Sequence, residues 1–320
     1  MQILKQASTD PFFNIATEEY LLRNSDENFF ILYRNEPSII VGKHQNTIAE
    51  INLDFVNCKG IKVVRRLSGG GTVYHDLGNL NYAFIANGSE GNLVDFKKFT
   101  QPIIDVLNTL GVDAQIGGKN DIRVGSKKIS GNAEHVYKNR VLHHGTLLFS
   151  SNLDVLNESI KIDPMAYTDK AVKSIRSNVA NITEYLKNDL PIDSFATLLT
   201  DHVSKLFSDA SPFTLNEAEI SAINNLIKTK YATWEWNFGY SPSYTLNRKI
   251  EVDSNQISID LTVEKGIISL ISISGYLDKN EASKLEQLLI GSKHDYDYLS
   301  KIITKSDLGI TTDKILGGLF

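Results

Sequence analysis

The sequence predicts a soluble protein of the α+β class, with a large N-terminal part and a small C-terminal part. Its 320 residues exceed the usual length of one domain. Hydrophobic residues make up 42% of the chain and charged residues 22%, as in globular proteins. Strand-like alternation and helix-like spacing both occur in each part of the chain. This mixture indicates an α+β or mixed α/β architecture.

Charge and composition exclude several kinds of protein. The chain has 33 basic and 38 acidic residues, a net charge of −5, so we do not expect a nucleic-acid-binding protein. The single cysteine, Cys58, excludes an intramolecular disulfide and a zinc site built from cysteines. No apolar run approaches the roughly 20 residues of a transmembrane helix, and the first residues do not resemble a signal peptide. We therefore expect a cytoplasmic protein with no membrane partner.

The first half of the chain is predicted to begin with a helix and to continue as strands. Asp10 can cap a helix in which Pro11 takes the first position. A glycine-rich loop is expected at 67–79, and a second helix over 96–111 that ends at Gly111. Strands are expected at 29–33, 38–41, 61–66 and 81–86.

The middle of the chain is predicted to change from strands to helices. Strands and tight turns are expected over 113–150, with Gly125-Ser126 as a hairpin turn. Helices are expected to dominate 152–230. Thr214 and Glu217 match the T-x-x-E pattern of a capping box, which predicts a helix start there.

The domain boundary is predicted near the end of a polar and aromatic segment, TWEWNFGYSPSYTL (233–246). Gly239 and Pro242 interrupt regular structure in this segment. Beyond it, strands are expected at about 249–253, 256–263 and 267–273, followed by one or two helices. We therefore expect domains at 1–245 and 246–320.

The first chemical signal is the segment RRLSGGGTVYHDLGN (65–79). Three consecutive glycines let backbone amides approach an anion closely, and Arg65 and Arg66 add positive charge that can bind phosphate. The segment matches neither a P-loop nor a dinucleotide-binding fingerprint. The alternative is a flexible turn that follows a strand and carries surface arginines.

The second signal is GGKNDIRVGSKKISGNAEH (117–135). Asn120 and Asp121 offer oxygen ligands for a hard cation. Lys127 and Lys128 alternate faces on a strand, so one of them can point inward, where it needs an anion. The alternative is a solvated lysine pair on a hairpin.

The third signal is HHGTLLF (143–149). His143 and His144 are adjacent, so on a strand they face opposite ways and cannot easily share a metal ion. Gly145, next to an apolar run, indicates that another group packs close to the backbone there.

Together these segments resemble the lipoate–protein ligase A family, which shares its catalytic fold with biotin protein ligases. The resemblance covers nearly the whole chain and implies mixed β-sheets flanked by helices, followed by the small α/β accessory domain of bacterial-type ligases. The matching segments are 10–22, 34–52, 65–85, 117–135, 143–149, 174–183 and 234–242.

The resemblance also implies roles for individual residues. Lys128, in KISGNA, would be the essential catalytic residue and would contact ATP and the adenylate. Arg66 would contact the carboxylate or phosphate end of the adenylate. Gly71, Thr72, Val73 and Tyr74 would bind ATP; Ser68, Gly69, Gly70, His75, His144, Gly145 and Thr146 would bind lipoate and the adenylate; Asn120 and Asp121 would lie near Mg²⁺ and phosphate.

The implied activity has two steps. Lipoate attacks the α-phosphate of Mg-ATP to give lipoyl-AMP, and an acceptor lysine then attacks the adenylate. A positioned ammonium would offset the repulsion between carboxylate and phosphate. The implied acceptors are the lipoyl domains of 2-oxoacid dehydrogenase E2 subunits or the glycine cleavage H protein, and the protein is expected to be a monomer. We expect Leu147, Phe149 and the strand at 61–64 to line a tunnel for the acyl chain.

Two other functions compete with the ligase. An ATP-independent lipoyl or octanoyl transferase has the same fold, but its cysteine-dependent branches use a thiol, and Cys58 lies outside the site motifs. A non-catalytic lipoate-binding sensor would lose a catalytic group, whereas Lys128, the glycine loop and Asn120-Asp121 are all present. Biotin ligation is disfavoured because SGGGTVYHD stands where that family has a basic Gly-Arg-rich loop.

Overall fold

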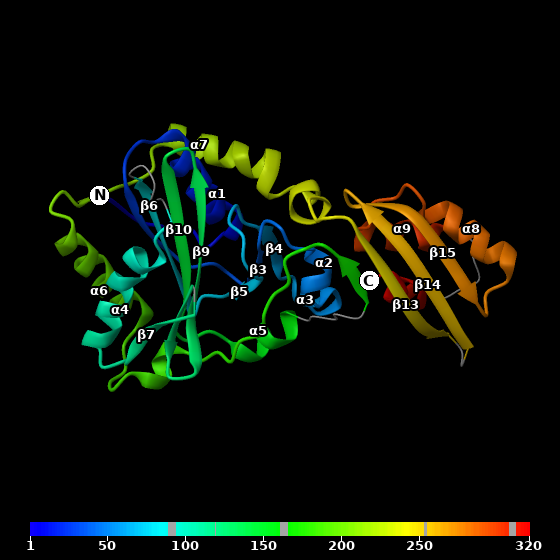
Figure 1. Ribbon diagram of the computed structural model, residues 1–320. Helices are drawn as coiled ribbons and strands as arrows, with labels where there is room; N and C mark the ends of the chain where they lie inside the picture. The colour runs from blue at the N-terminus through cyan, green and yellow to red at the C-terminus, as the bar shows by residue number, and fades with distance from the viewer. Residues whose placement is uncertain (89–93, 119, 161–165, 253–254, 307–311) are drawn as a thin grey trace. The chain divides into compact units, whose positions relative to one another are not determined.

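The computed structural model describes residues 1–88, 94–118, 120–160, 166–252, 255–306 and 312–320 (Figure 1). The chain packs into two compact units. The first unit comprises residues 1–43, 60–158 and 175–233, and the second comprises 44–59, 159–174 and 234–320.

The first unit is built on a sheet that has eight strands among the described residues, in the order β12-β1-β2-β6-β10-β9-β8-β7. β2 is the predicted FFILY run, and β8 and β9 form the predicted hairpin around Gly125, whose φ is +56°. The bounds are β1 Gln2–Lys5, β2 Phe29–Tyr33, β6 Asn79–Asn87, β7 Ala114–Gly117, β8 Asp121–Val124, β9 Lys127–Tyr137, β10 Arg140–Leu148 and β12 Ser211–Pro212.

A smaller sheet carries the glycine-rich segment. It has the order β4-β3-β5, with β3 at Ser38–Val41, β4 at Lys62–Arg65 and β5 at Val73–His75. The prediction of a loop over all of 67–79 is therefore wrong. Val73 and Tyr74 have strand-forming side chains and pair with the edge of β3, which lies more than thirty residues earlier in the chain.

Helices cover both faces of the large sheet (Figure 1). α1 begins as predicted, because Asp10 accepts a hydrogen bond from the Phe12 amide at 3.1 Å and Pro11 follows it. α4 packs against α6, whereas α1 packs against α7. The bounds are α1 Pro11–Asn24, α4 Phe96–Thr109, α5 Leu153–Ser159, α6 Ile192–Leu206 and α7 Glu217–Leu226, with a π-helical turn at Ile227–Tyr231.

The main hydrophobic core lies between the large sheet and the pair α4 and α6. Ile103 and Leu107 of α4 and Leu199 of α6 are fully buried against the apolar side chains of the strands. Phe149, just after β10, stacks on Phe195 of α6 with ring centroids 4.9 Å apart. This face of the sheet is therefore filled by side chains.

The second unit contains an antiparallel sheet of the order β11-β13-β14-β15. Lys265 and Gly266 form the turn between the expected strands β14 and β15, with φ values of +51° and +75°. Its elements among the described residues are α2 Thr47–Glu50, α3 Leu53–Lys59, β11 Tyr167–Asp169, a π-helical turn at Glu235–Gly239, β13 Tyr244–Val252, β14 Asn255–Glu264, β15 Ile267–Gly275, α8 Lys279–Leu289, α9 Tyr296–Lys305 and α10 Thr312–Leu319.

The second unit ends in more helix than the sequence predicts. α10 is a third helix after β15, and it includes Gly317 and Gly318. A Cβ at Gly318 would lie 2.6 Å from Ile259 Cδ1, so glycine lets this helix approach β14 closely. Within the described ranges, no helix is long and apolar enough to span a bilayer.

The predicted capping box at Thr214 and Glu217 is wrong, because α7 begins two residues later. The Glu219 amide donates to Asn216 Oδ1 at 2.9 Å, and the Asn216 amide donates to Glu219 Oε2 at 2.8 Å. The segment before this cap is tied to β1, where the Phe213 amide donates to the Ile3 carbonyl at 2.8 Å.

Replacing the true cap should destabilise the protein more than replacing the predicted one. We expect Asn216→Ala to lower the free energy of unfolding by about 1 kcal/mol, because the first-turn amide of Glu219 loses its acceptor. Thr214→Ala should change it by less than about 0.5 kcal/mol. Urea unfolding of the two variants measures both values, and equal losses would contradict the assignment of the cap.

Candidate active site

Arg65 and Arg66 both leave the end of β4 toward the protein interior. Arg65 is completely buried, and its Nη1 donates to the carbonyls of Gly42 and Lys43 at 3.0 and 3.1 Å. Arg66 is also buried. The alternative of surface arginines beside a flexible turn is therefore wrong.

The Arg66 guanidinium holds the glycine loop from within. Its Nε donates to Ser68 Oγ at 3.0 Å, and its Nη2 donates to the carbonyls of Gly69 and Gly71 at 2.6 and 2.8 Å. Its Nη1 reaches back to the Ile40 carbonyl of β3 at 2.9 Å. Burial lowers the pKa of Arg66 to about 10, while Glu18 and Tyr33 oppose this change. The guanidinium therefore fixes the loop to the small sheet.

The loop turns its carbonyls toward Arg66 and leaves its amides available. Gly70 has a φ of +87°, and a Cβ there would lie 3.1 Å from Arg66 Nη2, so only glycine fits this position well. Among the described residues, no group accepts a hydrogen bond from the amides of Gly69, Gly70 or Gly71. Successive unsatisfied amides of this kind form a binding site for an anion.

The backbone of Lys128 is hydrogen-bonded to the segment 178–180, which forms a clamp on this residue, and its side chain lies over Gly131. Its amide donates to the Asn178 carbonyl at 2.8 Å, and its carbonyl accepts from the Ala180 amide at 3.1 Å. A Cβ at Gly131 would lie 3.0 Å from both Lys128 Cε and Nζ, and 4.0 Å from Thr146 Oγ1. The ammonium therefore lies over Gly131, on the face of the sheet that bears Thr146.

The surroundings of Lys128 are poor in negative charge. Burial lowers the pKa of Lys128, the Asp121 carboxylate raises it, and Arg123 and Arg66 lower it further. Two guanidinium groups thus lie within electrostatic reach of this ammonium. An anionic ligand is the natural partner for such a group of cations.

Asn120 and Asp121 lie at the start of β8, on the edge of this cationic region. Asp121 Oδ2 accepts from Arg123 Nε at 2.9 Å and from Nη2 at 2.7 Å. Its Oδ1 is buried, and no described residue donates to it. Asn120 Nδ2 donates to the Asn132 carbonyl at 2.8 Å, which ties this turn to β9.

The donors near Asp121 fit Mg²⁺ only together with a nucleotide. No group of three His, Cys, Asp or Glu side chains capable of holding a metal occurs in the described part of the chain. One unpartnered carboxylate oxygen is available at Asp121. This donor set suits Mg²⁺, which usually binds through one or two carboxylates, substrate phosphates and water.

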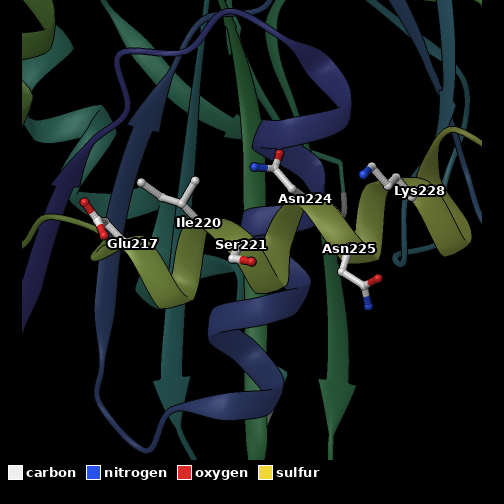
Figure 2. A pocket seen from close by; sticks show the side chains of 6 residues that line it. All are labelled: Glu217, Ile220, Ser221, Asn224, Asn225 and Lys228. Carbon is white, nitrogen blue, oxygen red and sulfur yellow. The ribbon is translucent and has the colours of Figure 1, made fainter.

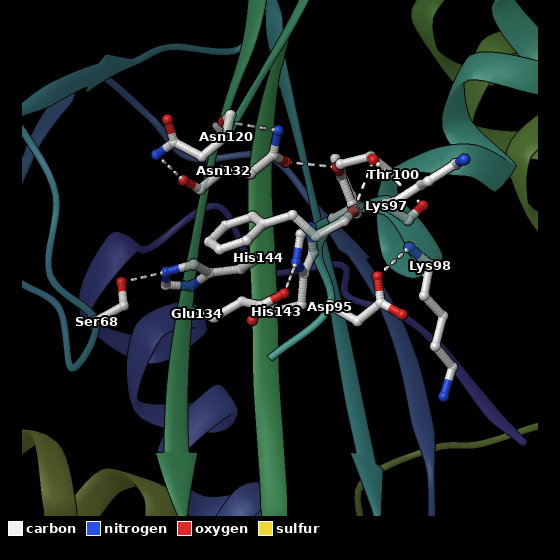
Figure 3. A network of polar contacts seen from close by, with 12 residues as sticks. Ser68, Asp95, Lys97, Lys98, Thr100, Asn120, Asn132, Glu134, His143 and His144 are labelled. Atoms are coloured by element: carbon white, nitrogen blue, oxygen red, sulfur yellow. Dashed lines mark hydrogen bonds and ion pairs between the residues drawn. The ribbon is translucent and has the colours of Figure 1, made fainter. Parts of the chain in front are cut away.

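His143 and His144 point to opposite faces of β10, as predicted (Figure 3). His143 Nδ1 lies 2.8 Å from Glu134 Oε1, and its ring packs 5.1 Å from the Phe99 ring of α4. His144 faces α1 instead: its Nδ1 lies 2.8 Å from Glu18 Oε2 and its Nε2 lies 2.6 Å from Ser68 Oγ. His144 thereby connects the strand to the glycine loop.

The predicted close approach at Gly145 is confirmed. A Cβ there would lie 2.0 Å from Asn132 Oδ1 and 2.7 Å from the Tyr82 ring. The Tyr82 hydroxyl donates to that same Asn132 oxygen at 2.5 Å. Because Gly145 has no side chain, the buried Tyr82 side chain can pass over β10 and reach Asn132 on β9.

The remaining predicted loop residues lie on or just before β5. His75 is buried, with its Nδ1 3.0 Å from Asn35 Nδ2, and burial followed by the charges of Arg66 and His144 lowers its pKa to about 3. Tyr74 is 3% exposed, and burial raises its pKa to about 12. Thr72 is buried and Val73 is half-buried.

The prediction that Leu147 and Phe149 line an acyl tunnel is wrong. Both side chains belong to the core between the large sheet and helices α4 and α6. Thr146 and His144 alternate with them and point to the other face of the sheet. The alternation was visible in the sequence, but the sequence did not reveal which face carried the site.

Sequence reasoning assigned no individual role to Glu18, Tyr33 or residues 178–180, although 10–22 and 174–183 were among the matching segments. Glu18 is a buried carboxylate in the first helix, for which the sequence predicted only the start at Asp10 and Pro11. The Tyr33 hydroxyl donates to Glu18 Oε1 at 2.9 Å. The clamp on Lys128 comes from a segment fifty residues further along the chain, and no local pattern connects the two.

A surface groove along α7 does not belong to this site. Its walls are side chains of α7 and the turn that follows it, which Figure 2 shows spread along one helix. The groove is lined by Glu217, Ile220, Ser221, Asn224, Asn225 and Lys228. None of the predicted site residues lines it.

The fold and the site are those of a protein suited to bind anionic ligands at a lysine and a glycine loop. Residues 10–204 match the family model of the lipoyl protein ligase A/B catalytic domain, and residues 241–316 match that of the bacterial lipoate protein ligase C-terminus. The chain is 40% identical to lipoate–protein ligase 1 of Staphylococcus aureus over 305 residues, which cover 94% of this chain and 92% of that protein. The chain belongs to the lipoate–protein ligase family.

Solved structures agree with this assignment. A crystal structure of lipoate–protein ligase A bound with ATP has a TM-score of 0.65 at 30% identity, and the match covers 75% of this chain and 98% of that one. An archaeal bipartite lipoate protein ligase from Thermoplasma acidophilum, studied with its E2 lipoyl domain, has a TM-score of 0.65 at 29% identity over 75% and 96% of the two chains. The resemblance to the lipoate–protein ligase A family and the expected fold are confirmed.

The position of Lys128 depends on the absence of a side chain at Gly131. We expect Gly131→Ala to displace the ammonium, because the new Cβ would lie 3.0 Å from Lys128 Nζ. The exchange of pyrophosphate into ATP in the presence of lipoate should fall by at least about tenfold, since a small misplacement of a catalytic group is costly. Thermal unfolding should change little, because only the flexible end of a lysine must move. Full exchange activity in this variant would contradict the placement of Lys128.

Proposed function

We propose that this protein activates lipoate with ATP and transfers the lipoyl group to a lysine of an acceptor protein. The observation that carries the proposal is the Lys128 ammonium, clamped across Gly131 within electrostatic reach of Arg66. Arg66 in turn holds a glycine loop whose amides have no acceptor among the described residues. Family membership supports the same activity.

In the first step, the lipoate carboxylate attacks the α-phosphate of ATP and pyrophosphate leaves. Both reactants are anions, so their approach is unfavourable unless fixed positive charge stabilises it. Lys128 supplies that charge, and the amides of the glycine loop bind the phosphate oxygens. Because these donors are held by Arg66 and by the clamp at 178–180, they need little reorganisation in the transition state.

In the second step, the amine of an acceptor lysine attacks the carbonyl carbon of lipoyl-AMP, and AMP leaves. No covalent enzyme intermediate is required. Cys58, the only thiol of the chain, is exposed on α3 of the second unit, whereas the site residues belong to the first unit. A thiol-dependent acyltransferase is therefore the weaker alternative.

The site residues keep the roles that the resemblance implies, with two refinements from the geometry. Arg66 acts mainly as the support of the loop, and Asp121 Oδ1 is the oxygen that would hold Mg²⁺, which would neutralise charge on the phosphates of ATP. The proposed ATP-binding residues are Arg66, Gly71, Thr72, Val73, Tyr74 and Lys128, and the proposed residues that bind lipoate and the adenylate are Arg66, Ser68, Gly69, Gly70, His75, Lys128, His144, Gly145 and Thr146.

Acceptor lipoyl domains are the proposed protein partners. The similar archaeal ligase was studied with the lipoyl domain of an E2 subunit, which supports acceptors of this class. We extend the proposal to the glycine cleavage H protein, and we propose a cytoplasmic monomer. Residues 1–245 would bind lipoate and ATP, and 246–320 would form the accessory domain, in keeping with the family match at 241–316.

The test is transfer of free lipoate to a purified apo lipoyl domain, read as an increase in the mass of the acceptor. We expect transfer only with Mg-ATP, together with release of AMP and pyrophosphate. Transfer from an acyl-carrier donor without ATP would instead identify an acyltransferase. Lipoate binding without any transfer would favour the sensor.

The same assay distinguishes the role of Lys128 from that of its neighbour Lys127. We expect Lys128→Ala to reduce formation of lipoyl-AMP by about 10²–10³-fold, the range seen when one transition-state donor is removed. Lys127→Ala is the matched control, because it removes the same charge one residue away and should change the rate little. Circular dichroism should show both variants folded. Equal effects of the two substitutions would contradict the assignment of Lys128.

A further inference from the structure

A buried hydrogen-bonded chain connects helix α1 to the glycine loop. The Tyr33 hydroxyl lies 2.9 Å from Glu18 Oε1, and Glu18 Oε2 lies 2.8 Å from His144 Nδ1. His144 Nε2 lies 2.6 Å from Ser68 Oγ, which lies 3.0 Å from Arg66 Nε. All five side chains are buried. The proposed adenylation step uses Arg66 as the support of the loop and His144 as part of the lipoate-binding set, but it assigns no proton-transfer role to Glu18, His144 or Tyr33.

The donors at the two ends fix the direction of every hydrogen bond in this chain. Arg66 Nε can only donate, so Ser68 Oγ accepts from it and directs its own proton to His144 Nε2. The Glu18 carboxylate accepts from the Tyr33 hydroxyl, whose pKa burial and Glu18 raise well above its usual value. Glu18 therefore also accepts from His144 Nδ1–H. A serine hydroxyl that donates to a carboxylate-held imidazole is arranged to pass on a proton.

The transfer step requires such a proton acceptor. A lysine amine is almost entirely protonated near neutral pH, and an ammonium cannot attack a carbonyl carbon. We infer that Ser68, His144 and Glu18 form a proton relay that deprotonates the acceptor lysine, an inference that rests on the proposed ligase function. Ser68 contacts the amine, His144 receives the proton, and Glu18 is a positioning residue that stabilises the resulting imidazolium.

The step balances in protons and bonds. One proton moves from the acceptor ammonium to Ser68 Oγ, while the Ser68 proton moves to His144 Nε2. The neutral amine then forms the C–N bond, and the bond from the carbonyl carbon to the phosphate oxygen of AMP breaks. The second proton lost by the nitrogen leaves with AMP into water, and His144 later returns its proton to solvent. The positive charges of Lys128 and Arg66 favour deprotonation of an ammonium that enters this region.

The other titratable groups near His144 are less suited to this role. His75 of β5 has a pKa lowered to about 3 by burial, Arg66 and His144, so it cannot hold a proton near neutral pH. His135 of β9 and His143 of β10 also interact electrostatically with His144, and burial lowers the pKa of each. Arg66 and Tyr33 retain their protons, and Glu18 is the carboxylate that contacts the ring.

The two half-reactions can be measured separately, which gives a direct test. Transfer is measured in single turnovers from synthetic lipoyl-AMP to an apo lipoyl domain, and adenylation is measured by exchange of pyrophosphate into ATP. We expect His144→Gln, which keeps a hydrogen-bonding side chain, to slow transfer by about 10²-fold. Glu18→Gln should slow it by about tenfold, because the imidazolium loses its counter-charge. Adenylation should change by less than about threefold in Glu18→Gln. In His144→Gln, which also alters a proposed lipoate-binding residue, transfer should fall by much more than adenylation does.

Hydroxylamine distinguishes a relay from a structural role, because it is already a neutral amine near neutral pH. Its reaction with enzyme-bound lipoyl-AMP should proceed at the wild-type rate in both variants, and raising the pH should restore transfer to the lipoyl domain. His135→Gln is the matched control. That histidine lies on the neighbouring strand β9, on the same face of the sheet as His144, and makes no hydrogen bond with a described residue. Its replacement should leave both half-reactions unchanged.

Three results would overturn the relay. One is unchanged transfer in His144→Gln, and another is an equal loss of transfer with hydroxylamine and with the lipoyl domain. The third is a loss of adenylation as large as the loss of transfer. If His144→Gln does not fold, Glu18→Gln decides the question by the same comparisons. The same two measurements on the wild-type protein test the ligase function separately. A wild-type protein that neither exchanges pyrophosphate into ATP nor transfers lipoate from lipoyl-AMP would contradict the ligase function, whatever the variants do.

Discussion

The buried Arg66 guanidinium is the interaction on which the rest of the site depends. An unpaired charge in this position would cost several kcal/mol, and here it is offset by four oxygen acceptors and by Glu18 at the far end of a hydrogen-bonded chain. Two of the acceptors are carbonyls of the glycine loop, Gly69 and Gly71. Because these carbonyls face Arg66, the loop amides are left to bind an anionic ligand. The buried Arg66 cation thus determines the conformation of the glycine loop to which a phosphate would bind.

Helix α1 fixes the other end of this arrangement through two adjacent glutamates. Glu18 contacts Tyr33 and His144 on the sheet side. Glu19 accepts hydrogen bonds from Arg23 of the same helix at 2.7 Å, and from Lys230 and Tyr231 at 2.6 Å each. Burial alone would raise the pKa of Glu19, but the hydrogen bonds and charges of these partners lower it overall. Both glutamates are therefore held as acceptors, and the position of α1 relative to β10 is set by polar contacts as well as by packing.

Local patterns in the sequence predicted most strands and the first helix, because these depend on neighbouring residues. These patterns failed where the conformation or position of a residue depends on a partner that is distant in the sequence. Val73–His75 was expected to be loop because its partner strand lies far away in the sequence, and Leu147 was assigned to the wrong face because alternation does not identify the faces. Lys128 was singled out by family resemblance, whereas the structure selects it through the distant segment 178–180. Glu18 was missed because its partners are brought together only by the fold.

The most direct test of this account is the affinity of the protein for Mg-ATP in the variant Arg66→Lys, measured by calorimetric titration without lipoate. Lysine keeps the positive charge but cannot bond the loop carbonyls, Ser68 and the β3 carbonyl together. Thermal unfolding of the same sample shows whether the variant remains folded. We expect binding to weaken by at least about tenfold, because charge-assisted hydrogen bonds are lost. Unchanged affinity would mean that charge alone matters and would contradict the claim that Arg66 shapes the loop.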